Sequence, residues 1–206
     1  MTEEEAAALV CSDVSRETAR RLQRYVDRLK GEAGVQNLIS AATIDQIWQR
    51  HILDSSQLLT HASGEDGLWL DIGSGAGLPG IVIAILRSDP IVLLEPRAKR
   101  AAFLRQLVED LGLGGDAQVI DKTAVSAPPL KAAIISARAV ASLDALFSMA
   151  SRFAAPETLW VLPKGRSAAD ELAAAQRSWQ GEFRLAPSQT DSSASIVLAR
   201  GVRPKR

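Results

Sequence analysis

The fold of this chain is decided by one glycine-rich stretch, Asp71-Ile72-Gly73-Ser74-Gly75-Ala76-Gly77-Leu78-Pro79-Gly80. The apolar run Leu68–Leu70 precedes it and is short enough for a buried strand, and Ile81–Leu86 follows with the pattern of a helix. Glycines in such a turn let the backbone adopt left-handed angles and approach a ligand closely, because no Cβ stands in the way. The stretch therefore predicts a strand, a glycine turn and a helix whose first N–H groups face a ligand.

A second predicted strand ends in an acid. The run Ile91–Leu94 is apolar, and Glu95 follows it, 22 residues after Gly73. A carboxylate at the tip of the second strand binds the ribose hydroxyls of a nucleoside cofactor in folds of this kind. The glycine turn and Glu95 together indicate a nucleoside cofactor site. The alternatives are a tight turn with no ligand, and a Glu95 that only caps the helix after Pro96.

Two cofactor classes compete for this site. The spacing Gly75-x-Gly77-x-x-Gly80 satisfies the dinucleotide fingerprint, so an NAD-dependent oxidoreductase is one interpretation. Pro79, however, is not what a turn under a pyrophosphate usually carries. The pattern acid-x-Gly-x-Gly-x-Gly that begins at Asp71 resembles the first motif of class I methyltransferases, which use S-adenosylmethionine. We favour S-adenosylmethionine, with a nicotinamide dinucleotide as the alternative.

The chain is predicted to have two parts. Residues 1–62 form a helical extension, with capping boxes at Thr2-x-x-Glu5 and Thr43-x-x-Gln46 and a break at 31–34. Residues 63–206 form the methyltransferase domain, where short apolar strands alternate with helices and predict a mostly parallel sheet covered on both faces. We expect strands at 68–71, 91–95, 117–120, 132–136, 158–162, 183–186 and 196–199, and helices at 78–87, 97–111, 143–153 and 168–179. Seven strands with a terminal hairpin match the Rossmann-like sheet of a class I methyltransferase, an α/β fold.

The composition is that of an enzyme with a full core. The 206 residues suit one domain plus an extension, and 47% of them are hydrophobic. The acidic N-terminus lacks a signal-peptide layout and no apolar run approaches a membrane span, so we expect a cytoplasmic protein. The single Cys11 and the widely spaced His51 and His61 predict neither a disulfide nor a metal site. A net charge of zero argues against broad nucleic-acid binding but permits a local basic face.

Six motifs occur in order along the chain: Asn37–Ser40, Arg50–Ser55, Asp71–Gly80, Lys99–Arg100 followed by Phe103–Arg105, Ser136–Ala139, and Lys164–Gly165. In this set the chain resembles the RsmG (GidB) family of bacterial methyltransferases, from about residue 20 to residue 200. The resemblance implies methylation of guanine N7 in the decoding-region loop of 16S ribosomal RNA. The implied partner is naked RNA or the assembled small subunit, and a monomer is expected.

The resemblance also implies site residues. The expected cofactor contacts are Asp71, Gly73, Gly75, Gly77, Leu78, Glu95, Thr123, Ala124 and Arg138. The chain departs from the family where Lys122 and Ala124 replace the usual arginine and glutamate, which removes a side-chain bond to the adenine. Ala133 is a second departure, since relatives often carry an acid there. These departures are what would support a non-enzymatic alternative, an RNA-binding scaffold with a degenerate cofactor fold.

The expected chemistry needs no general base. Guanine N7 carries a free lone pair at neutral pH, so the rate gain comes from orientation, and no catalytic acid–base set is evident. Arg138 is expected to position guanine O6, a phosphate or the cofactor carboxylate. His51 and Asp54, one helical turn apart, either tie their helix to the sheet or touch RNA.

Basic residues are the expected RNA contacts. The predicted set is Asn37, Lys99, Arg100 and Lys164, with Arg105 and Arg166 completing a phosphate-binding rim. The alternative is that these are ordinary surface cations. Loose segments are expected at 126–129, at 188–193 and in the basic tail Arg200–Arg206, which either contacts RNA or is a solvated terminus.

Overall fold

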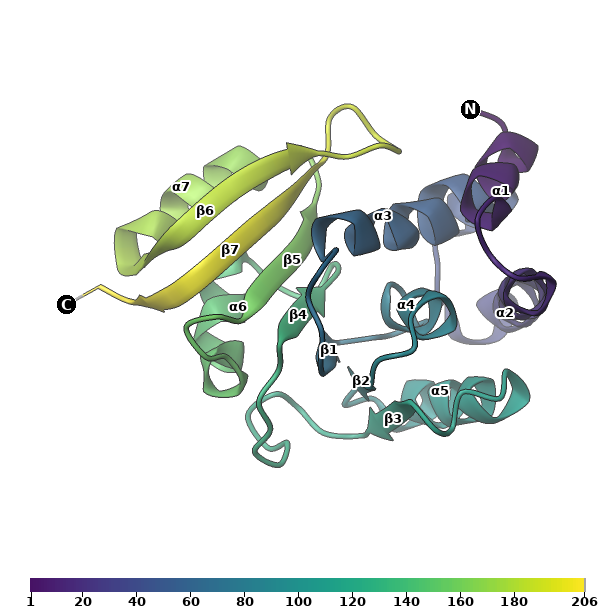
Figure 1. The fold of residues 1–206 in the computed structure, drawn as a ribbon, viewed down its shortest axis with the longest axis horizontal. Coiled ribbons are helices and arrows are strands. Elements are labelled where there is room, and N and C mark those ends of the chain that lie inside the picture. The colour runs from purple at the N-terminus through teal and green to yellow at the C-terminus, as the bar shows by residue number, and fades with distance from the viewer. Residues whose placement is uncertain (206) are drawn as a thin grey trace.

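A single sheet organises the computed structural model, which describes residues 1–205; Arg206 lies outside the described residues. Within this range seven strands pair in the order β3-β2-β1-β4-β5-β7-β6 (Figure 1). The strands are β1 (Trp69–Ile72), β2 (Ile91–Leu94), β3 (Ala117–Ile120), β4 (Ile134–Ala137), β5 (Leu159–Lys164), β6 (Trp179–Pro187) and β7 (Ser195–Pro204). Strands β1 to β5 are parallel, and β7 runs antiparallel to both β5 and β6. The predicted α/β sheet with a terminal hairpin is confirmed.

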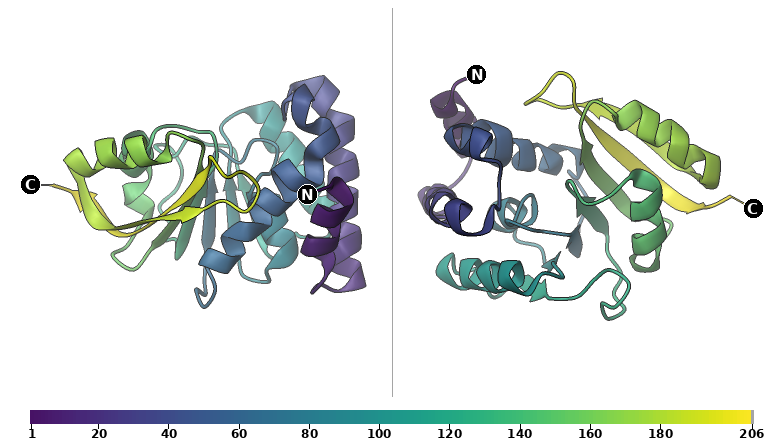
Figure 2. Two further views of the ribbon diagram at one scale, coloured as in Figure 1. Left: turned by 90° about the horizontal axis from the view of Figure 1, so that it is seen from above. Right: turned by 180° about the vertical axis from the view of Figure 1, so that it is seen from behind.

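Helices cover both faces of this sheet (Figure 2). One face carries α1 (Glu3–Cys11), α2 (Arg16–Gln36), η2 (Trp48–Leu53), α3 (Asp54–His61), α4 (Gly80–Leu86) and α5 (Ala98–Asp110), with the short helix η1 (Ala41–Gln46) joining α2 to η2. The other face carries α6 (Leu143–Ala150), η3 (Ser151–Phe153) and α7 (Ala168–Ser178). The first strand is therefore buried on both sides, and it is apolar throughout except at Asp71.

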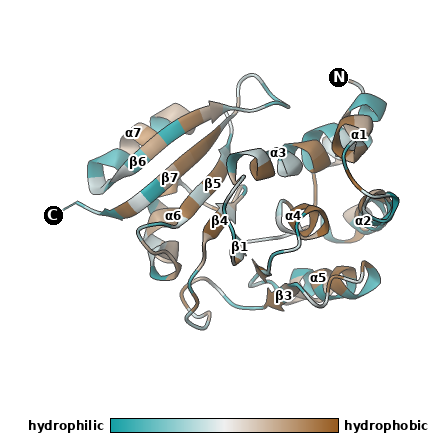
Figure 3. Cartoon of the chain, viewed as in Figure 1, coloured by the Kyte–Doolittle hydropathy of each residue, from teal (hydrophilic) through white to brown (hydrophobic). Residues whose placement is uncertain are grey.

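Strand periodicity divides the core into two layers. Trp69 points to the layer under α4 and the N-terminal helices, while its neighbour Leu70 points to the layer under α6. In the second layer Phe147 and Trp160 meet edge to face with their ring centroids 5.1 Å apart. The hydropathy colouring shows that the central strands are mainly hydrophobic, whereas the helices carry both hydrophobic and hydrophilic residues (Figure 3). Full burial of one such side chain contributes about 1.5–3 kcal/mol.

The N-terminal segment corrects two predictions. Helix α2 continues through the glycines at 31–34, so the predicted break is wrong. The helix ends at Gln36 and is followed by its C-cap Asn37, whose φ is +49°. A Cβ at Gly31 or Gly34 would contact nothing, so both face outward while the buried stripe keeps the helix together. The capping box at Thr2 and Glu5 is confirmed. The one at Thr43 is wrong, because its hydroxyl bonds to the Ser40 carbonyl and to His51 instead.

The C-terminal hairpin is longer than predicted. Strand β6 begins at Trp179, which pairs with Pro204, so residues 200–204 belong to β7 and the prediction of a loose tail is wrong for them. The Arg200 guanidinium pairs with Glu65 and so joins this strand to the segment before β1. No helix among residues 1–205 is both long and apolar enough to cross a membrane.

Candidate active site

The glycine loop connects β1 to α4, as predicted. Gly73, Gly75 and Gly77 have φ values of +68°, +57° and +96°, a region that other residues rarely adopt. A Cβ at Gly73 would lie 2.6 Å from Val140 Cγ2, and one at Gly77 would lie 2.6 Å from Ile81 Cγ1. At Gly75 the nearest atoms would be Gly73 O at 3.6 Å and Arg100 Nη1 at 3.7 Å, which are ordinary contact distances, so among these three glycines only Gly75 has space for a Cβ.

Asp71 lies behind the loop. Its side chain is fully buried, with Oδ1 accepting from Ser136 Oγ at 2.7 Å and Oδ2 from the Gly80 N–H at 3.2 Å. Burial raises the pKa of Asp71 to about 6, against the opposing effect of these hydrogen bonds. Asp71 therefore connects the start of α4 to β4 through these two hydrogen bonds. Leu78, another predicted cofactor contact, is also buried in the core.

Glu95 closes the loop from the next strand. Its carboxylate is 3% exposed and accepts two backbone N–H groups, from Gly75 at 2.9 Å and from Arg97, at the start of α5, at 2.8 Å. The second bond is to the residue that immediately precedes α5, so Glu95 fixes the turn before this helix and does not cap its first turn. The first bond was not predicted, and it places Glu95 beside Gly75 of the loop.

A cavity of about 270 Å³ opens next to this carboxylate, and we call it the Glu95 cavity. Its walls include Gly73, Glu95, Thr123, Ala124 and Val140, all but the last expected at a cofactor site. Lys122, one of the two departures from the family pattern, also lines it. The other predicted cofactor residues lie elsewhere: Asp71 and Leu78 in the core, Gly75 and Gly77 in the loop, and Arg138 in a neighbouring cavity.

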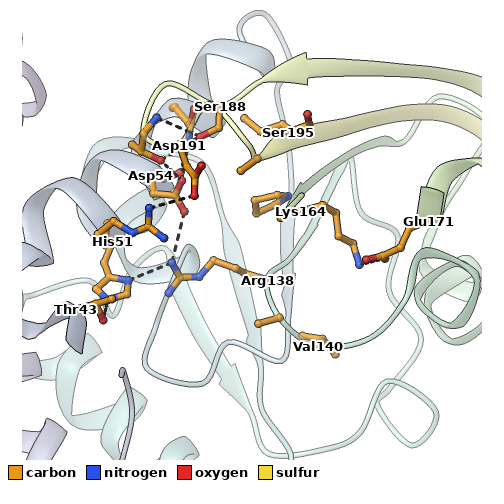
Figure 4. A pocket seen from close by; sticks show the side chains of 18 of the residues that line it. Thr43, His51, Asp54, Arg138, Val140, Lys164, Glu171, Ser188, Asp191 and Ser195 are labelled. Atoms are coloured by element: carbon orange, nitrogen blue, oxygen red, sulfur yellow. Dashed lines mark hydrogen bonds and ion pairs between the residues drawn. The ribbon is translucent and has the colours of Figure 1, made fainter. Parts of the chain in front are cut away.

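That neighbouring cavity, the Arg138 cavity, has a volume of about 730 Å³ (Figure 4). It lies where strands β4 and β5 end, and the N-terminal helices and the β6–β7 loop complete its walls. Ala139 and Val140 line both cavities, so the two adjoin at this turn. Ala139 has a φ of +55°, an uncommon angle for a residue other than glycine.

Arg138 joins the N-terminal helices to the sheet. Its Nη1 lies 3.3 Å from His51 Nδ1 and 3.6 Å from Asp54 Oδ2. Since arginine can only donate, His51 Nδ1 accepts, and Nε2 therefore carries the proton and donates to Thr43 Oγ1 at 2.9 Å. Burial, followed by the charges of Arg138 and Arg50, lowers the pKa of His51 to about 4. His51 is therefore neutral at pH 7 and ties its helix to the sheet, one of the two roles expected.

The β6–β7 loop is bonded to the same helices. Thr190 donates to Asp54 Oδ1 at 2.6 Å, and the Gln189 N–H donates to Gln57 Oε1 at 2.8 Å. Residues 188–193 do form a loop, but these bonds hold it at the rim of the Arg138 cavity rather than leaving it loose.

The predicted basic rim is divided between two places. Asn37, Lys99 and Arg100 line a cavity of about 730 Å³ at the start of α5, which we call the Lys99 cavity. Lys164 is not with them: it lines the Arg138 cavity, where its Nζ pairs with Glu171 at 2.8 Å. Of the remaining cations, Arg105 pairs with Asp121 at 2.9 Å and Arg166 is exposed.

Two features of the site were missed from the sequence. Glu171 lines the Arg138 cavity, yet in the sequence it is one of many acids in a polar helix. Tyr25 of α2 donates to the carbonyl of Ala76 in the glycine loop at 3.1 Å, from 51 residues away. Among residues 1–205, no group of three or more histidine, cysteine or acidic side chains is placed to hold a metal ion.

Comparison with known proteins gives a consistent result. The sequence model of the family described as rRNA small subunit methyltransferase G (GidB) matches residues 18–198. A protein named ribosomal RNA small subunit methyltransferase G from Rhizorhabdus wittichii is 44% identical over 207 residues, covering 100% of this chain and 95% of its own. The protein of that name from Erythrobacter litoralis is 43% identical over 201 residues, covering 97% of both.

Solved structures share the fold at low identity. A methyltransferase from Geobacter sulfurreducens aligns with a TM-score of 0.58 at 14% identity, covering 86% of this chain and 88% of its own. A mutant of MtNAS in complex with S-adenosylmethionine also gives 0.58, at 18% identity, with coverages of 96% and 83%. The dinucleotide oxidoreductase and the non-enzymatic scaffold gain no support from these matches. The chain belongs to the rRNA small subunit methyltransferase G (GidB) family, as its ordered motifs predicted.

Proposed function

We propose that this enzyme transfers a methyl group from S-adenosylmethionine, held in the Glu95 cavity, to N7 of a guanine of 16S ribosomal RNA that enters the Arg138 cavity. One observation carries the assignment of the two cavities: they adjoin at Ala139 and Val140. A donor in one and an acceptor in the other therefore meet at this turn, which is the geometry that a direct transfer requires.

The residues of the Glu95 cavity suit the cofactor. The Glu95 carboxylate lies at the end of β2, where it would accept hydrogen bonds from the ribose hydroxyls, and Thr123 and Ala124 line the part of the cavity that we assign to the adenine. We assign the methionine part to the glycine loop beside this cavity, where Gly73 lines the wall and Gly75 bonds to Glu95. We assign Asp71 an indirect role, since its buried carboxylate shapes the loop. When bound, S-adenosylmethionine supplies an electrophilic methyl group.

The protein's own contribution is to orient and to exclude water. Guanine N7 bears no proton at neutral pH, so no side chain has to remove one, and the neutral His51 is occupied by its bonds to Arg138 and Thr43. Arg138 supports the site by holding α3 against β4 through Asp54. We infer that the Ala139–Val140 turn limits how far the reacting groups can separate.

The assignment of domains and partners follows the same proposal. We propose that residues 63–206 form the catalytic domain and residues 1–62 an extension that shares its core and walls off the Arg138 cavity. The Lys99 cavity, with Asn37, Lys99 and Arg100, is the proposed contact for RNA phosphates. A ribosomal substrate implies a cytoplasmic enzyme, and we propose that the monomer is the active unit.

The test is to identify the methylated nucleoside. Purified enzyme and radiolabelled S-adenosylmethionine are incubated with naked 16S ribosomal RNA and with small subunits, both from a strain that lacks this activity. We expect 7-methylguanosine at one position in at least one of the two substrates after digestion. Label on another base, on protein, or on neither substrate while the cofactor binds normally would contradict the proposal.

A further inference from the structure

A charged pair lies across the Arg138 cavity from Arg138 (Figure 4). Lys164 ends strand β5, Glu171 lies in the first turn of α7, and their Nζ and Oε2 atoms are 2.8 Å apart. Their side chains are only 10% and 26% exposed. An ion pair with one half-buried partner contributes little to stability, and even a fully buried pair is often replaced by apolar residues without loss. Stability alone therefore gives little reason to keep charges here.

Both members of the pair retain capacity for further hydrogen bonds. The Lys164 ammonium has three protons and uses them for Ala141 O at 2.6 Å and for Glu171, which leaves one. Glu171 accepts from Lys164 at Oε2 and from Ser167 at Oε1, and the backbone of Leu143 also bonds to its carboxylate. A carboxylate has about four lone-pair sites, so Glu171 keeps capacity for a further donor. Burial raises the pKa of Glu171, but these bonds outweigh that effect and hold the pKa below its usual value. Glu171 is therefore an anion at neutral pH.

The pair presents a donor next to an acceptor, which is the complement of guanine. The Watson–Crick edge of guanine carries the O6 acceptor beside the N1–H and 2-amino donors. Adenine has the reverse order, with a 6-amino donor beside the N1 acceptor. Enzymes that modify a nucleobase read this edge when the base has left the helical stack, and single-stranded RNA is recognised in the same way. N7 lies on the other side of O6 from N1, so a base held by this edge keeps N7 free.

We propose that Lys164 and Glu171 select the target base, with the Lys164 ammonium donating to O6 and the Glu171 carboxylate accepting from N1–H and the 2-amino group. The inference rests on the proposed function and names the residues that make it specific for guanine. It also moves base recognition away from Arg138, whose Nη1 is engaged by His51 and Asp54. Such a site is selective because a wrong base covers its polar groups without forming hydrogen bonds to them.

A purely structural pair would connect β5, α7 and the turn at Ala141 without touching the base. The two roles differ in how they respond to the 2-amino group. If Glu171 accepts from the 2-amino group, removing either the group or the carboxylate abolishes the same hydrogen bond, so the two losses of binding free energy are not additive. If the pair is structural, the two changes are independent, and their fold-decreases in kcat/KM multiply.

The experiment uses small subunits assembled from 16S ribosomal RNA that carries guanosine or inosine at the target position, since inosine lacks only the 2-amino group. The kcat/KM is measured for the wild type, Glu171→Met and Lys164→Met, with Asp170→Asn, an exposed acid of the same helix, as the matched control. Methionine is chosen at both positions because its side chain keeps a similar length and makes no strong hydrogen bond. Thermal unfolding and the Kd for S-adenosylmethionine are measured for each variant, so that a folding defect is distinguished from a loss of recognition.

We expect inosine to lower kcat/KM of the wild type by about tenfold. Glu171→Met should lower kcat/KM on guanosine by about ten- to a hundredfold, and replacing guanosine by inosine should change its kcat/KM by less than about twofold. Lys164→Met should have a lower kcat/KM on guanosine and a further decrease of about tenfold on inosine, and Asp170→Asn should match the wild type. A decrease of about tenfold on inosine in Glu171→Met, or wild-type activity in that variant, overturns the inference alone. Failure of the wild type to methylate guanosine subunits, with cofactor binding intact, overturns the proposed function and the inference with it.

Discussion

The carboxylate of Glu95 accepts the backbone N–H of Gly75 at 2.9 Å, so the tip of strand β2 is bonded to the glycine loop that follows β1. The other oxygen of the same carboxylate accepts the Arg97 N–H at the start of α5. One acid therefore sets the distance between the two walls of the Glu95 cavity. The proposed binding of ribose hydroxyls is compatible with these two backbone bonds, since each carboxylate oxygen accepts more than one donor.

Replacing Glu95 by alanine should weaken cofactor binding by about ten- to a hundredfold, because charge-assisted bonds of this kind contribute about 1.5–3 kcal/mol each. Titration calorimetry with S-adenosylmethionine measures the change. Glu109→Ala, an exposed acid on α5, is the control and should bind as the wild type does. An unchanged Kd in folded Glu95→Ala would leave Glu95 with only its two backbone bonds.

Two glycine substitutions should separate ligand binding from packing. Gly75→Val adds a branched side chain at a position with space for a Cβ but with a φ of +57°, so we expect a folded, less stable protein that no longer binds S-adenosylmethionine. Gly80→Ala places a Cβ 2.3 Å from Leu93 Cδ2 and 2.7 Å from Asp71 Oδ2, so it should cost about 1–3 kcal/mol of stability. Circular dichroism melting and calorimetry on both variants are the measurements. Normal cofactor affinity in Gly75→Val would show that this loop does not bind the cofactor.

His51 should make the protein sensitive to acid. Its pKa is about 4 in the folded state against 6.5 for an ordinary histidine, so the unfolded chain binds the proton more tightly and stability is lost as pH falls through this window. Asp71 acts in the opposite direction, since its raised pKa of about 6 favours the folded state as pH falls. Comparison with His51→Asn isolates the histidine. The stability advantage of the wild type, from urea unfolding, should shrink from pH 7 to pH 4.5, and a constant difference would contradict the assignment.

The methyl-transfer step should be nearly independent of pH between about 6.5 and 8, because none of guanine N7, guanine N1–H and His51 changes its protonation state there. Single-turnover rates at saturating cofactor and RNA measure this step directly. A pH–rate profile with a region in which the rate changes tenfold per pH unit would identify a required acid or base and would refute the base-free mechanism.

Lys99→Glu should weaken RNA binding and flatten its salt dependence, since removing one lysine–phosphate ion pair lowers the slope by about one. Lys99 is preferred to Arg100, which lines the Glu95 cavity as well as the Lys99 cavity and so affects both ligands. Filter binding over a salt series gives the slope, and calorimetry should show an unchanged cofactor Kd. Arg177→Glu, an exposed cation on α7, is the matched charge reversal and should bind RNA normally.

Local patterns predicted most of the fold. Short apolar runs that alternate with amphipathic helices predicted the parallel sheet. The glycines, together with Glu95 at the end of the next strand, predicted the position of the Glu95 cavity. Both predictions succeed because backbone conformation and hydrophobic periodicity depend on residues that are neighbours in sequence. The errors concern element ends. Gly34 did not stop α2, since the buried stripe that includes Leu29 outweighs the cost of a glycine in a helix, and the tail was drawn into β7 by pairing with β6.

The sequence by itself determined the fold class, the glycine loop and the family, through residues whose spacing along the chain carries the information. Only the tertiary structure decided which distant side chains meet: Arg138 with His51 across 87 residues, Thr190 with Asp54 across 136, and Lys164 in the Arg138 cavity rather than beside Lys99. The physical reason is that such contacts depend on how helices and loops pack on the sheet. Packing is set by the whole core and leaves no periodic signal in the segments that it brings together.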